Sequence, residues 1–404
     1  MIEVVGIGDD GWDGLSQVCR SRILAAPVLI GGARHLALVP DVAGQVRRTW
    51  PTPLLTRLGS FLSDVRELDV VALASGDPLR SGVGTTLIEL LGADQVRITP
   101  ALSSETLARA RMGWSADDTE VVTLVGRSLD RIRRHLSPGA RLVVLCSDGS
   151  GPRQIAAVLT SEGCGDSSIT AWSHLGGVDE QRRDGVASTW GTDPSPDLVL
   201  LCVEVAADAL RRPVVGPAGG RPDDAFEHDG QISKSDIRAS AMARLRPHPG
   251  GVLWDLGAGS GAVAIEWCLA APGAKSVAVE RDEGRAAGIA SNAARLGVPS
   301  EVRVVRDDVV SMVRTSANLP RPAAIFIGGG LDPEVIELAL AVLVPGGRLV
   351  AHAVTLESEA AMVAAAGVHG GTLTRLSIEH AEPLGRFLSW KPARAIVQWS
   401  VSTP

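Results

Sequence analysis

Short apolar runs alternate with helical stretches along the first half of the chain. The helical stretches lie between the apolar runs, for example at 85–92 and 152–163. Strands that alternate with helices indicate an α/β fold with a mainly parallel sheet. We therefore predict an α/β domain over residues 1–205, with strands at 2–8, 27–32, 70–76, 95–100, 120–126, 141–148 and 197–205.

The same alternation starts again after residues 206–222, which are rich in Pro, Gly and Arg and form the best linker candidate. A helical stretch at 234–247 precedes strand-like segments at GVLWDLG, SVAVERD, EVRVVRDD, AAIFIGGG and GGRLVAHAV. The tail, TLTRLSIEHAEPL and then ARAIVQWSV, predicts a closing antiparallel hairpin. The halves share no obvious repeat, so we predict a second, unrelated α/β domain over residues 223–404.

Charge and composition exclude several classes of function. The net charge is −7 and neither half has a basic excess, whereas a nucleic-acid-binding domain carries a basic face. No uninterrupted apolar run approaches the roughly 18 residues of a membrane span, and the first residues lack a signal-peptide pattern. The five Cys residues have no metal-ligand spacing. We expect a cytoplasmic protein with reduced thiols, no metal site, and neither nucleic acid nor membrane as a partner.

A glycine-rich turn in the second half, DLGAGSG at 255–261, joins a buried strand to a helix. Its glycines let the backbone turn tightly and approach a ligand, and the helix points its free N–H groups at that ligand. By itself the motif also fits a dinucleotide site, because Gly257 to Ala262 satisfies GxGxxA. The candidate ligand-binding residues of this turn are Asp255, Gly257, Ala258, Gly259, Ser260 and Gly261.

Three features favour S-adenosylmethionine (SAM) over NAD. Asp255 precedes the glycines, and Glu280 ends the next strand, where a carboxylate can accept both hydroxyls of a ribose. Asp308, after the third strand, can accept from an adenine amino group. A late strand follows the PGG turn in LVPGGRLVA at 343–351. Together these features resemble class I SAM methyltransferases, which have a Rossmann-like fold.

Residues 223–390 resemble the precorrin methyltransferases that act at carbon 15 and decarboxylate. The resemblance rests on DDAFEHDGQISKSDIRA, LWDLGAGSGAVAIEW, IFIGGG and LVAHAVTLESE. It implies that Ser233 contacts SAM and that Val309 makes a backbone contact to the adenine. The family pattern often has Asn where this chain has His352, so the resemblance assigns His352 no definite role.

The first half carries a Gly-Asp-Pro turn in VVALASGDPLRSGVG at 70–84, which lacks the Lys of a P-loop. Alone it is explained as an ordinary turn. With VVGIGDDG, ITPALSSETLA, VVTLVGR and SDGSGPRQIA it resembles the tetrapyrrole methylase family, in the branch that methylates carbon 5 of a precorrin. This implies a class III fold with two α/β lobes and SAM between them, in a pocket lined by Ser75, Gly76, Asp77, Ser103, Ser104 and Val125. Gly8 and Asp9 would lie on the tetrapyrrole side.

In this order the halves resemble the fused precorrin methyltransferases of cobalamin biosynthesis. The resemblance implies one SAM per domain, a precorrin methylated at carbons 5 and 15, decarboxylation of its ring-C acetate, and a homo-oligomer. No catalytic acid or base is evident, because methyl transfer depends mainly on proximity and alignment. Cationic and polar side chains suit the substrate's carboxylates. The candidates, each also explained as a solvated surface residue, are Lys234, Arg238, His352 and Arg375.

Other functions remain open from the sequence. One domain alone could be active, with the other a scaffold or a SAM-sensing module, although both glycine turns look intact. An NAD-linked oxidoreductase is disfavoured by Asp255 and by the first half of the chain. A non-catalytic nucleotide-binding module would not need two unrelated cofactor pockets. The number of SAM sites per chain separates these possibilities.

Overall fold

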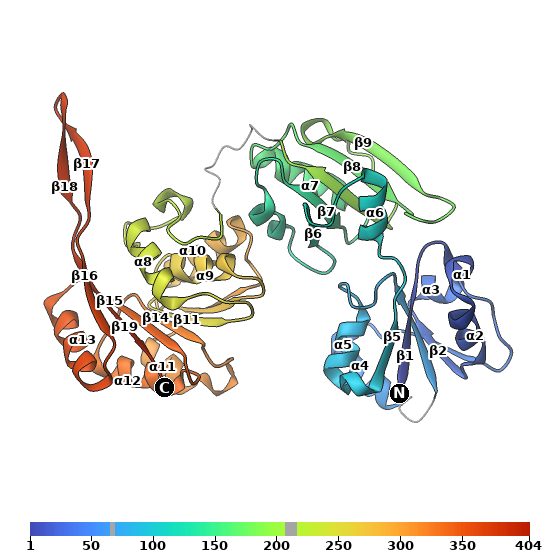
Figure 1. Cartoon of the computed structure of the whole chain (residues 1–404), viewed down its shortest axis with the longest axis horizontal. Helices are drawn as coiled ribbons and strands as arrows, with labels where there is room; N and C mark the ends of the chain where they lie inside the picture. The colour runs from blue at the N-terminus through green and yellow to red at the C-terminus, as the bar shows by residue number, and fades with distance from the viewer. Residues whose placement is uncertain (65–68, 207–215) are drawn as a thin grey trace. The chain divides into compact units, whose positions relative to one another are not determined.

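The computed structural model describes residues 1–64, 69–206 and 216–404. It divides into two compact units, each described here by itself. The N-terminal unit runs from blue to green in Figure 1 and the C-terminal unit from yellow-green to red. The short segment Asp130–Arg134 groups with the C-terminal unit. Of the predicted linker, residues 207–215 lie outside the described residues.

The first sheet of the N-terminal unit is wholly parallel, with strand order β3-β2-β4-β1-β5. Its central strands β1, β2 and β4 are buried on both faces, which is typical of parallel sheets covered by helices. One face packs Val4, Ile30 and Leu58, and the other packs Val5, Ile23 and Leu29. The elements are β1 (Ile2–Ile7), α1 (Gly11–Gly14), α2 (Gln17–Ala25), β2 (Val28–Gly31), α3 (Ala33–Ala37), β3 (Val46–Thr49), α4 (Leu54–Ser63), β4 (Val70–Ser75), α5 (Val83–Leu91) and β5 (Val96–Thr99).

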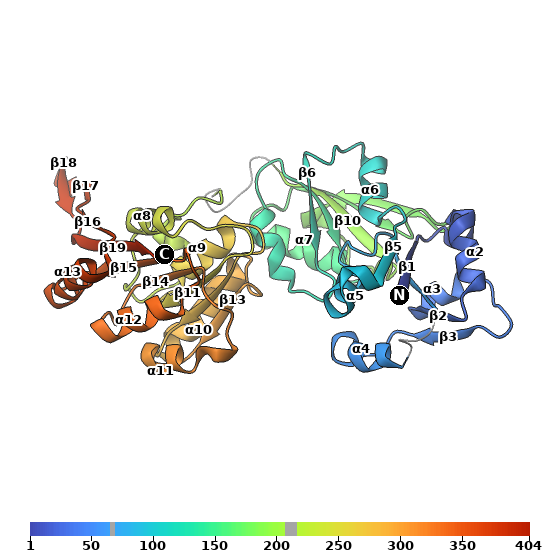
Figure 2. The ribbon, with the colours of Figure 1, turned by 60° about the horizontal axis from the view of Figure 1, so that its bottom comes forward.

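The second sheet of this unit is mostly antiparallel, with order β6-β7-β10-β8-β9. Only β6 and β7 pair in parallel, so the prediction of a mainly parallel sheet is correct for the first sheet and wrong here. The physical reason is the short connection between β8 and β9, which joins antiparallel neighbours. The sheets are separate in both views (Figures 1 and 2). The elements are α6 (Ser104–Met112), β6 (Thr119–Thr123), β7 (Arg141–Leu145), α7 (Gly151–Ser161), β8 (Ser168–Ser173), β9 (Gln181–Val186) and β10 (Val199–Glu204).

The C-terminal unit is built on a seven-stranded sheet with order β13-β12-β11-β14-β15-β19-β16. The first five strands are parallel, and β19 runs antiparallel to both its neighbours. From β11 the chain adds β12 and then β13 on one side, and it returns to the other side of β11 to add β14 and β15. This change of direction creates a topological switch point between β11 and β14. The strands are β11 (Val252–Leu256), β12 (Lys275–Val279), β13 (Val302–Val305), β14 (Ala324–Ile327), β15 (Arg348–Ala353), β16 (Thr372–Leu376) and β19 (Ile396–Ser402).

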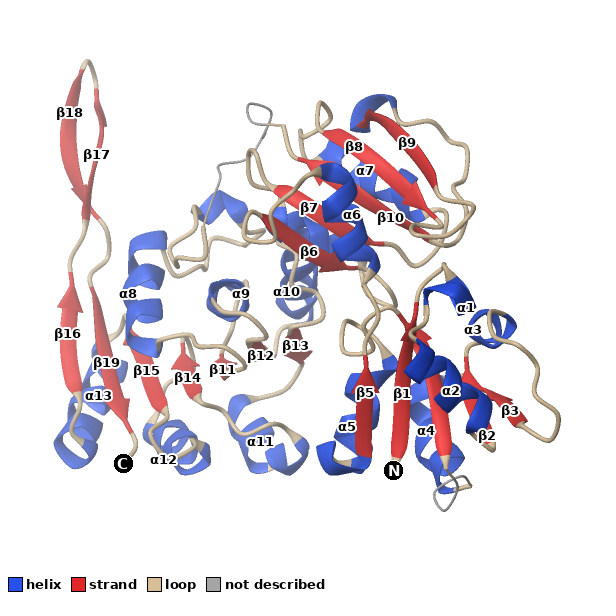
Figure 3. Cartoon of the chain, turned by 45° about the vertical axis from the view of Figure 1, so that its right-hand side comes forward, coloured by secondary structure: helices blue, strands red, loops and turns tan. Residues whose placement is uncertain are grey.

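Helices cover both faces of this sheet (Figure 3). Trp267, on α9, lies in the core that α8, α9 and α10 form on one face of the sheet. Trp254, on β11, lies in the core on the opposite face. Both indoles are fully buried. The helices are α8 (Ser235–Leu245), α9 (Ala262–Ala270), α10 (Glu283–Arg295), α11 (Val309–Arg314), α12 (Pro333–Val342) and α13 (Leu356–His369). No helix among the described residues has the length and apolar character needed to cross a membrane.

A separate hairpin is inserted between β16 and β19. Its strands, β17 (Glu379–Leu384) and β18 (Phe387–Pro392), pair only with each other and are exposed along their whole length. Figure 1 shows the hairpin extending away from the sheet. The tail therefore differs from the single closing hairpin predicted: β16 and β19 do pair antiparallel, with β17 and β18 added between them.

Candidate functional site

A cavity of about 1360 Å³ opens at the carboxyl ends of the parallel strands in the C-terminal unit. The turns after β11, β12, β13 and β14 and the end of β15 all contribute to its lining. This is where ligands bind in open α/β sheets, because the turns diverge at a switch point and leave a crevice. The sequence-predicted residues that line the cavity are Ser233, Lys234, Gly257, Ala258, Gly259, Ser260, Glu280, Asp308, Val309 and His352.

The glycine turn after β11 requires glycine for geometric reasons. Gly257 has φ +73°, and a Cβ there would lie 2.7 Å from the carbonyl oxygen of Gly329. Gly261 has φ +74°, and a Cβ there would lie 2.6 Å from Ile289. No other residue type tolerates both the left-handed backbone and the close approach. The turn thus brings main-chain atoms to the cavity wall, at the start of α9.

Glu280 fixes this turn from the neighbouring strand. Its Oε2 accepts a hydrogen bond from the N–H of Gly259 at 2.9 Å, and its Oε1 accepts one from the N–H of Asp282 at 3.0 Å. Each carboxylate oxygen has capacity for a second hydrogen bond. Glu280 is buried but lines the cavity. It can therefore hold the loop and still accept hydroxyl groups of a ligand.

Asp308 has a capping role as well as a place in the cavity wall. Its Oδ1 accepts from the N–H groups of Val310 and Ser311, at 3.0 and 3.4 Å, and so begins α11. Its Oδ2 has no such bond to the helix. The next residue, Val309, also lines the cavity. A carboxylate oxygen and a backbone group therefore lie side by side at the edge of the cavity near β13.

Asp255 and Gly261, predicted as ligand contacts, are not among the residues that line the cavity. Asp255 is 1% exposed, and its Oδ2 accepts from the N–H of Ala264 at 3.0 Å, which ties the end of β11 to α9. Burial raises the pKa of Asp255 to about 7, against the lowering effect of the Ala264 hydrogen bond. Asp255 thus stabilises the glycine turn from a buried position, through its hydrogen bond to α9.

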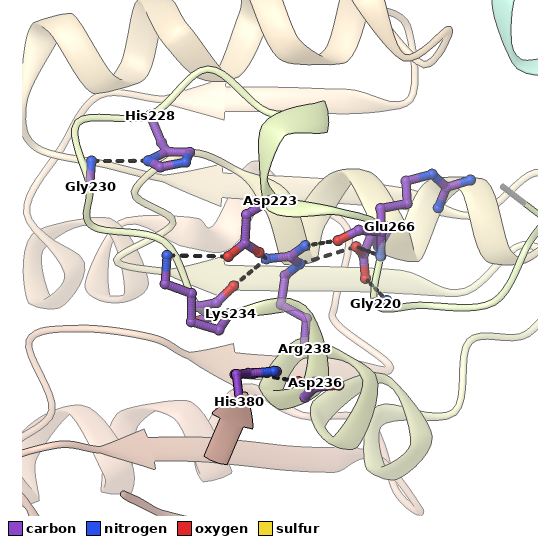
Figure 4. Close-up of polar contacts among 11 residues, drawn as sticks. Gly220, Asp223, His228, Gly230, Lys234, Asp236, Arg238, Glu266 and His380 are labelled. Carbon is purple, nitrogen blue, oxygen red and sulfur yellow. Dashed lines mark hydrogen bonds and ion pairs between the residues drawn. The ribbon is translucent and has the colours of Figure 1, made fainter. Parts of the chain in front are cut away.

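Arg238, predicted as a substrate ligand, is wholly buried and does not line the cavity. Figure 4 shows its polar contacts inside the domain. Its Nε donates to Glu266 at 3.1 Å and its Nη1 to Asp223 at 2.8 Å. It also donates to the main-chain oxygens of Ser233 and Arg221. An arginine on an 11-residue helix with mixed polar neighbours gives no sequence signal of this burial.

The same buried network anchors the segment that leads into the domain. Glu266, on α9, is fully buried and accepts from the N–H groups of Gly220 and Arg221, at 2.8 and 2.9 Å. Residues 220 and 221 fall in the predicted linker, yet they are bonded into the C-terminal unit. Lys234 sits at the cavity rim, paired with Asp223 at 3.2 Å. The network therefore positions the loop at 230–236 that closes one side of the cavity.

His352 and Arg375 have different surroundings. His352 is buried in the cavity wall, with Nε2 3.0 Å from Oε1 of Gln398 on the adjacent strand and its ring edge-on to Phe326. Burial lowers the pKa of His352 to about 4, so the imidazole is neutral near pH 7. Arg375 pairs with Glu359 and is outside the cavity lining. Its prediction as a substrate ligand is not supported by this placement.

In the N-terminal unit, three chain segments meet at the carboxyl end of the first sheet. The N–H of Gly76 donates to the oxygen of Ile7, and the N–H of Ala101 donates to the oxygen of Gly76, both at 3.0 Å. Gly76 has φ +49°, and a Cβ there would lie 3.1 Å from Cα of Ser103. Ser75, Gly76 and Ser103 are therefore brought together. Ser104 is the first residue of α6, and the Asp77 Oδ1 accepts from the N–H of Leu79.

Asp9 connects this region to the second lobe. Its Oδ1 accepts from Nη1 of Arg34 at 2.7 Å, and its Oδ2 lies 3.0 Å from Nδ1 of His174, which follows β8. Arg34 and His35 also reach Oγ of Ser75, at 3.5 and 2.9 Å. Burial, then the nearby Arg34, lowers the pKa of His35 to about 4. Gly8 lies next to Asp9 in this loop, whereas Val125 follows β6 and is 49% exposed.

Several residues of the cavity were not singled out from the sequence. Gly328 to Gly330 follow β14, and the IFIGGG motif could have indicated them. Gly328 and Gly329 pack against the glycine turn. His380, Lys391 and Arg394 reach the cavity from the base of the β17–β18 hairpin. No local signal marks them, because the hairpin's path back to the cavity depends on tertiary structure.

Comparison with known proteins gives matches to both halves. The model of the tetrapyrrole (corrin/porphyrin) methylases matches residues 1–189, and that of the precorrin methyltransferase domain matches residues 224–403. The chain is 45% identical over 404 residues to the precorrin-6Y C(5,15)-methyltransferase [decarboxylating] of Mycobacterium tuberculosis, covering 100% of both chains. The protein of that name from a Sinorhizobium species is 42% identical over 400 residues, covering 99% and 95%.

A solved structure resembles the second half. The crystal structure of the C-terminal domain of precorrin-6Y C5,15-methyltransferase from Rhodobacter capsulatus is 42% identical to the chain. The match covers 46% of this chain and 100% of that one, with a TM-score of 0.44.

Proposed function

The chain belongs to the family of decarboxylating precorrin-6Y C(5,15)-methyltransferases, and on that premise we propose that each of its two domains binds a SAM molecule of its own. As a family member it is a SAM-dependent methyltransferase of cobalamin biosynthesis that methylates precorrin-6Y at carbons 5 and 15 and removes the ring-C acetate carboxyl, giving precorrin-8X. We assign carbon 5 to residues 1–205, and carbon 15 with the decarboxylation to residues 223–404. Similarity over the full length supports two working domains and not a single active one.

The observation that carries the proposal for the C-terminal domain is the pairing of Glu280 with Gly259 at the mouth of the cavity. The main chain of the glycine turn can approach SAM closely, and Glu280 and Asp308 offer carboxylate oxygens for its ribose and adenine. The lining from residues 230–335, called here the cofactor half, contains all three groups. Ser233, Ala258, Ser260 and Val309 complete the proposed contacts.

The lining from residues 352–396 is called here the substrate half. It is contributed by β15, by β16 and by the segment around the hairpin. SAM supplies the methyl group together with its own leaving group. The protein's part is to hold the meso carbon of the macrocycle in line with that methyl group, a contribution worth about 7–11 kcal/mol. We propose that His352, in the substrate half, and Lys234, at the cavity rim in the cofactor half, contact the tetrapyrrole.

For the N-terminal domain we propose that SAM lies at the junction of Gly76 with Ser103. Three chain segments approach closely there, because the N–H of Gly76 bonds to Ile7 and the N–H of Ala101 bonds to Gly76. Ser75, Asp77, Ser104 and Val125 are the further proposed contacts. Gly8 and Asp9 are proposed to face the tetrapyrrole, where Asp9 also joins the two lobes of this unit.

We further propose a homo-oligomer and a cytoplasmic location. The β17–β18 hairpin exposes Leu384, Phe387, Leu388 and Trp390, an apolar surface that a second copy could cover. All five cysteines are free thiols, which supports a reducing compartment. Size-exclusion chromatography with light scattering tests the first of these proposals, since a strictly monomeric chain would exclude it.

The proposed assignment of one methylation to each domain is tested by mass spectrometry of the products made from precorrin-6Y and SAM. The wild type should add two methyl groups and lose one CO₂. The variant Gly259→Arg places a large side chain at φ +57° in the C-terminal glycine turn, and should add one methyl group without losing CO₂. Loss of both methylations in this variant, with the fold intact, would contradict two separate sites.

A further inference from the structure

The cationic side chains of the C-terminal cavity fall into two groups. Among the residues that the structure describes, five Lys and Arg side chains line the cavity. Three of them pair with carboxylates: Lys234 with Asp223 at 3.2 Å, Arg285 with Asp229 at 2.8 Å, and Lys391 with Glu382 at 2.8 Å. Arg281 and Arg394 form no ion pair or hydrogen bond with any residue that the structure describes. These two guanidinium groups are therefore available to a ligand.

The two free cations lie in different halves of the cavity. Arg281 directly follows Glu280 at the end of β12, in the cofactor half. Arg394 lies in the connection from β18 to β19, in the substrate half. The only acid that the described substrate half contributes to the lining is Glu382, which is already paired with Lys391. Arg394 is thus not paired with the one carboxylate of its own half of the cavity.

The rest of the lining of the substrate half consists of two histidines and apolar residues, and His380 lies 3.4 Å from Asp236. His352 is neutral and bonded to Gln398. The apolar part of the lining is a surface on which a flat conjugated ring can pack, contributed by Val354, Leu376, Ile378, Pro392, Ala393 and Ile396. An apolar wall beside one unpaired guanidinium fits a ligand with an apolar ring and carboxylates on its periphery.

The main chain holds Arg394 at this place. The N–H of the preceding residue, Ala393, donates to the oxygen of Ile378 at 2.8 Å, which closes the base of the hairpin. Ile396, two residues later, is buried. The Cα of Arg394 is therefore fixed between two anchored positions, while its side chain is exposed to the cavity.

We propose that Arg394 is the carboxylate-binding residue of the substrate half, where its guanidinium pairs with a peripheral acetate or propionate of the tetrapyrrole. The inference rests on the proposed function of the C-terminal domain. A guanidinium can bind a carboxylate through two parallel hydrogen bonds, which sets the orientation of the ring as well as its affinity. Arg394 thereby takes the role that the sequence suggested for Arg238 and Arg375, which the structure places elsewhere.

The test is the variant Arg394→Gln, with CO₂ release from precorrin-6Y as the readout because the proposed function places that step in the C-terminal domain. We expect the KM for precorrin-6Y to rise about ten- to a hundred-fold, since a charge-assisted bond is lost. The kcat should change far less. The affinity for S-adenosylhomocysteine should be unchanged, which also shows that the domain is folded. Arg394→Lys should recover part of the KM.

The matched control is Arg375→Gln, which removes a guanidinium outside the cavity and should leave KM unchanged. An unchanged KM in Arg394→Gln would overturn the inference while leaving the proposed function standing. Equal loss of S-adenosylhomocysteine binding would overturn it too, since the role would then be structural. If the wild type itself releases no CO₂ from precorrin-6Y, the proposed function fails, and the inference fails with it.

Discussion

Glu280 accepts a hydrogen bond from the main-chain N–H of Gly259 over 2.9 Å, so the acid that ends one strand holds the glycine turn that follows its neighbour. This bond makes the position of the turn depend on a residue 21 places further along the chain. The same carboxylate lines the cavity. The Glu280 side chain therefore both holds the glycine turn in place and is positioned to bind a ligand in the cavity.

Substitution of Glu280 by Gln should weaken cofactor binding to the C-terminal domain. The amide has only one acceptor oxygen, so it cannot accept from both Gly259 and Asp282. We expect the affinity of that domain for S-adenosylhomocysteine to fall about tenfold or more, measured by calorimetric titration. Glu283→Gln is the control, because Glu283 is exposed and pairs with Arg306. Equal affinities in the two variants would contradict the role of Glu280.

Buried Asp255 should make stability depend on pH. Its folded pKa of about 7 lies above its ordinary value of 3.8, so the folded state retains a proton that the unfolded chain has released. The free energy of unfolding should therefore fall as pH rises from about 4 to about 7, by about 1.4 kcal/mol for each pKa unit. Asn at this position cannot titrate.

The measurement compares thermal unfolding of the wild type and Asp255→Asn at several pH values. The stability of the variant relative to the wild type should increase from pH 4 to pH 7. A difference that is constant over this range would show that Asp255 does not titrate there.

We expect Arg238 to contribute strongly to the free energy of unfolding. Replacing it with Met leaves the fully buried Glu266 without its cationic partner, which typically costs about 3–5 kcal/mol. Arg375→Met removes an exposed ion pair with Glu359, and should cost about 0–1 kcal/mol. Denaturant unfolding measures both values. Restoration of stability by the double variant Arg238→Met with Glu266→Gln would identify the buried charge as the cause, whereas similar losses in the two single variants would refute it.

Asp9 should affect only the N-terminal reaction. Asp9→Asn weakens the ion pair with Arg34 and the contact with His174, which joins the two lobes. We expect slower methylation at carbon 5 with CO₂ release unchanged, as followed by mass spectrometry. The neighbouring Asp10→Asn serves as the control. A parallel fall in CO₂ release would mean that Asp9 acts on the whole chain and not on one domain.

The sequence predicts well the features that depend on short-range patterns. It predicts poorly the features that depend on contacts between residues far apart in the chain. Alternating strands, the glycine turn at 257–261 and the acid at 280 follow from short-range patterns, and the structure brings Gly257, Gly259 and Glu280 to one cavity. Arg238 and Arg375 look alike in sequence, yet one is buried and the other is exposed, because burial depends on which helix faces which sheet. The antiparallel pairing of β8 and the return of the hairpin to the cavity at Arg394 are tertiary features of the same kind.

The most direct test of the whole account is the number of S-adenosylhomocysteine sites per chain, counted by calorimetric titration. The wild type should show two sites. Gly259→Arg should retain one, and Gly76→Arg should retain the other, because each substitution puts a side chain at a positive φ in one glycine turn only. A wild type with a single site that Gly259→Arg abolishes would contradict the claim that the chain joins two independent methyltransferase domains.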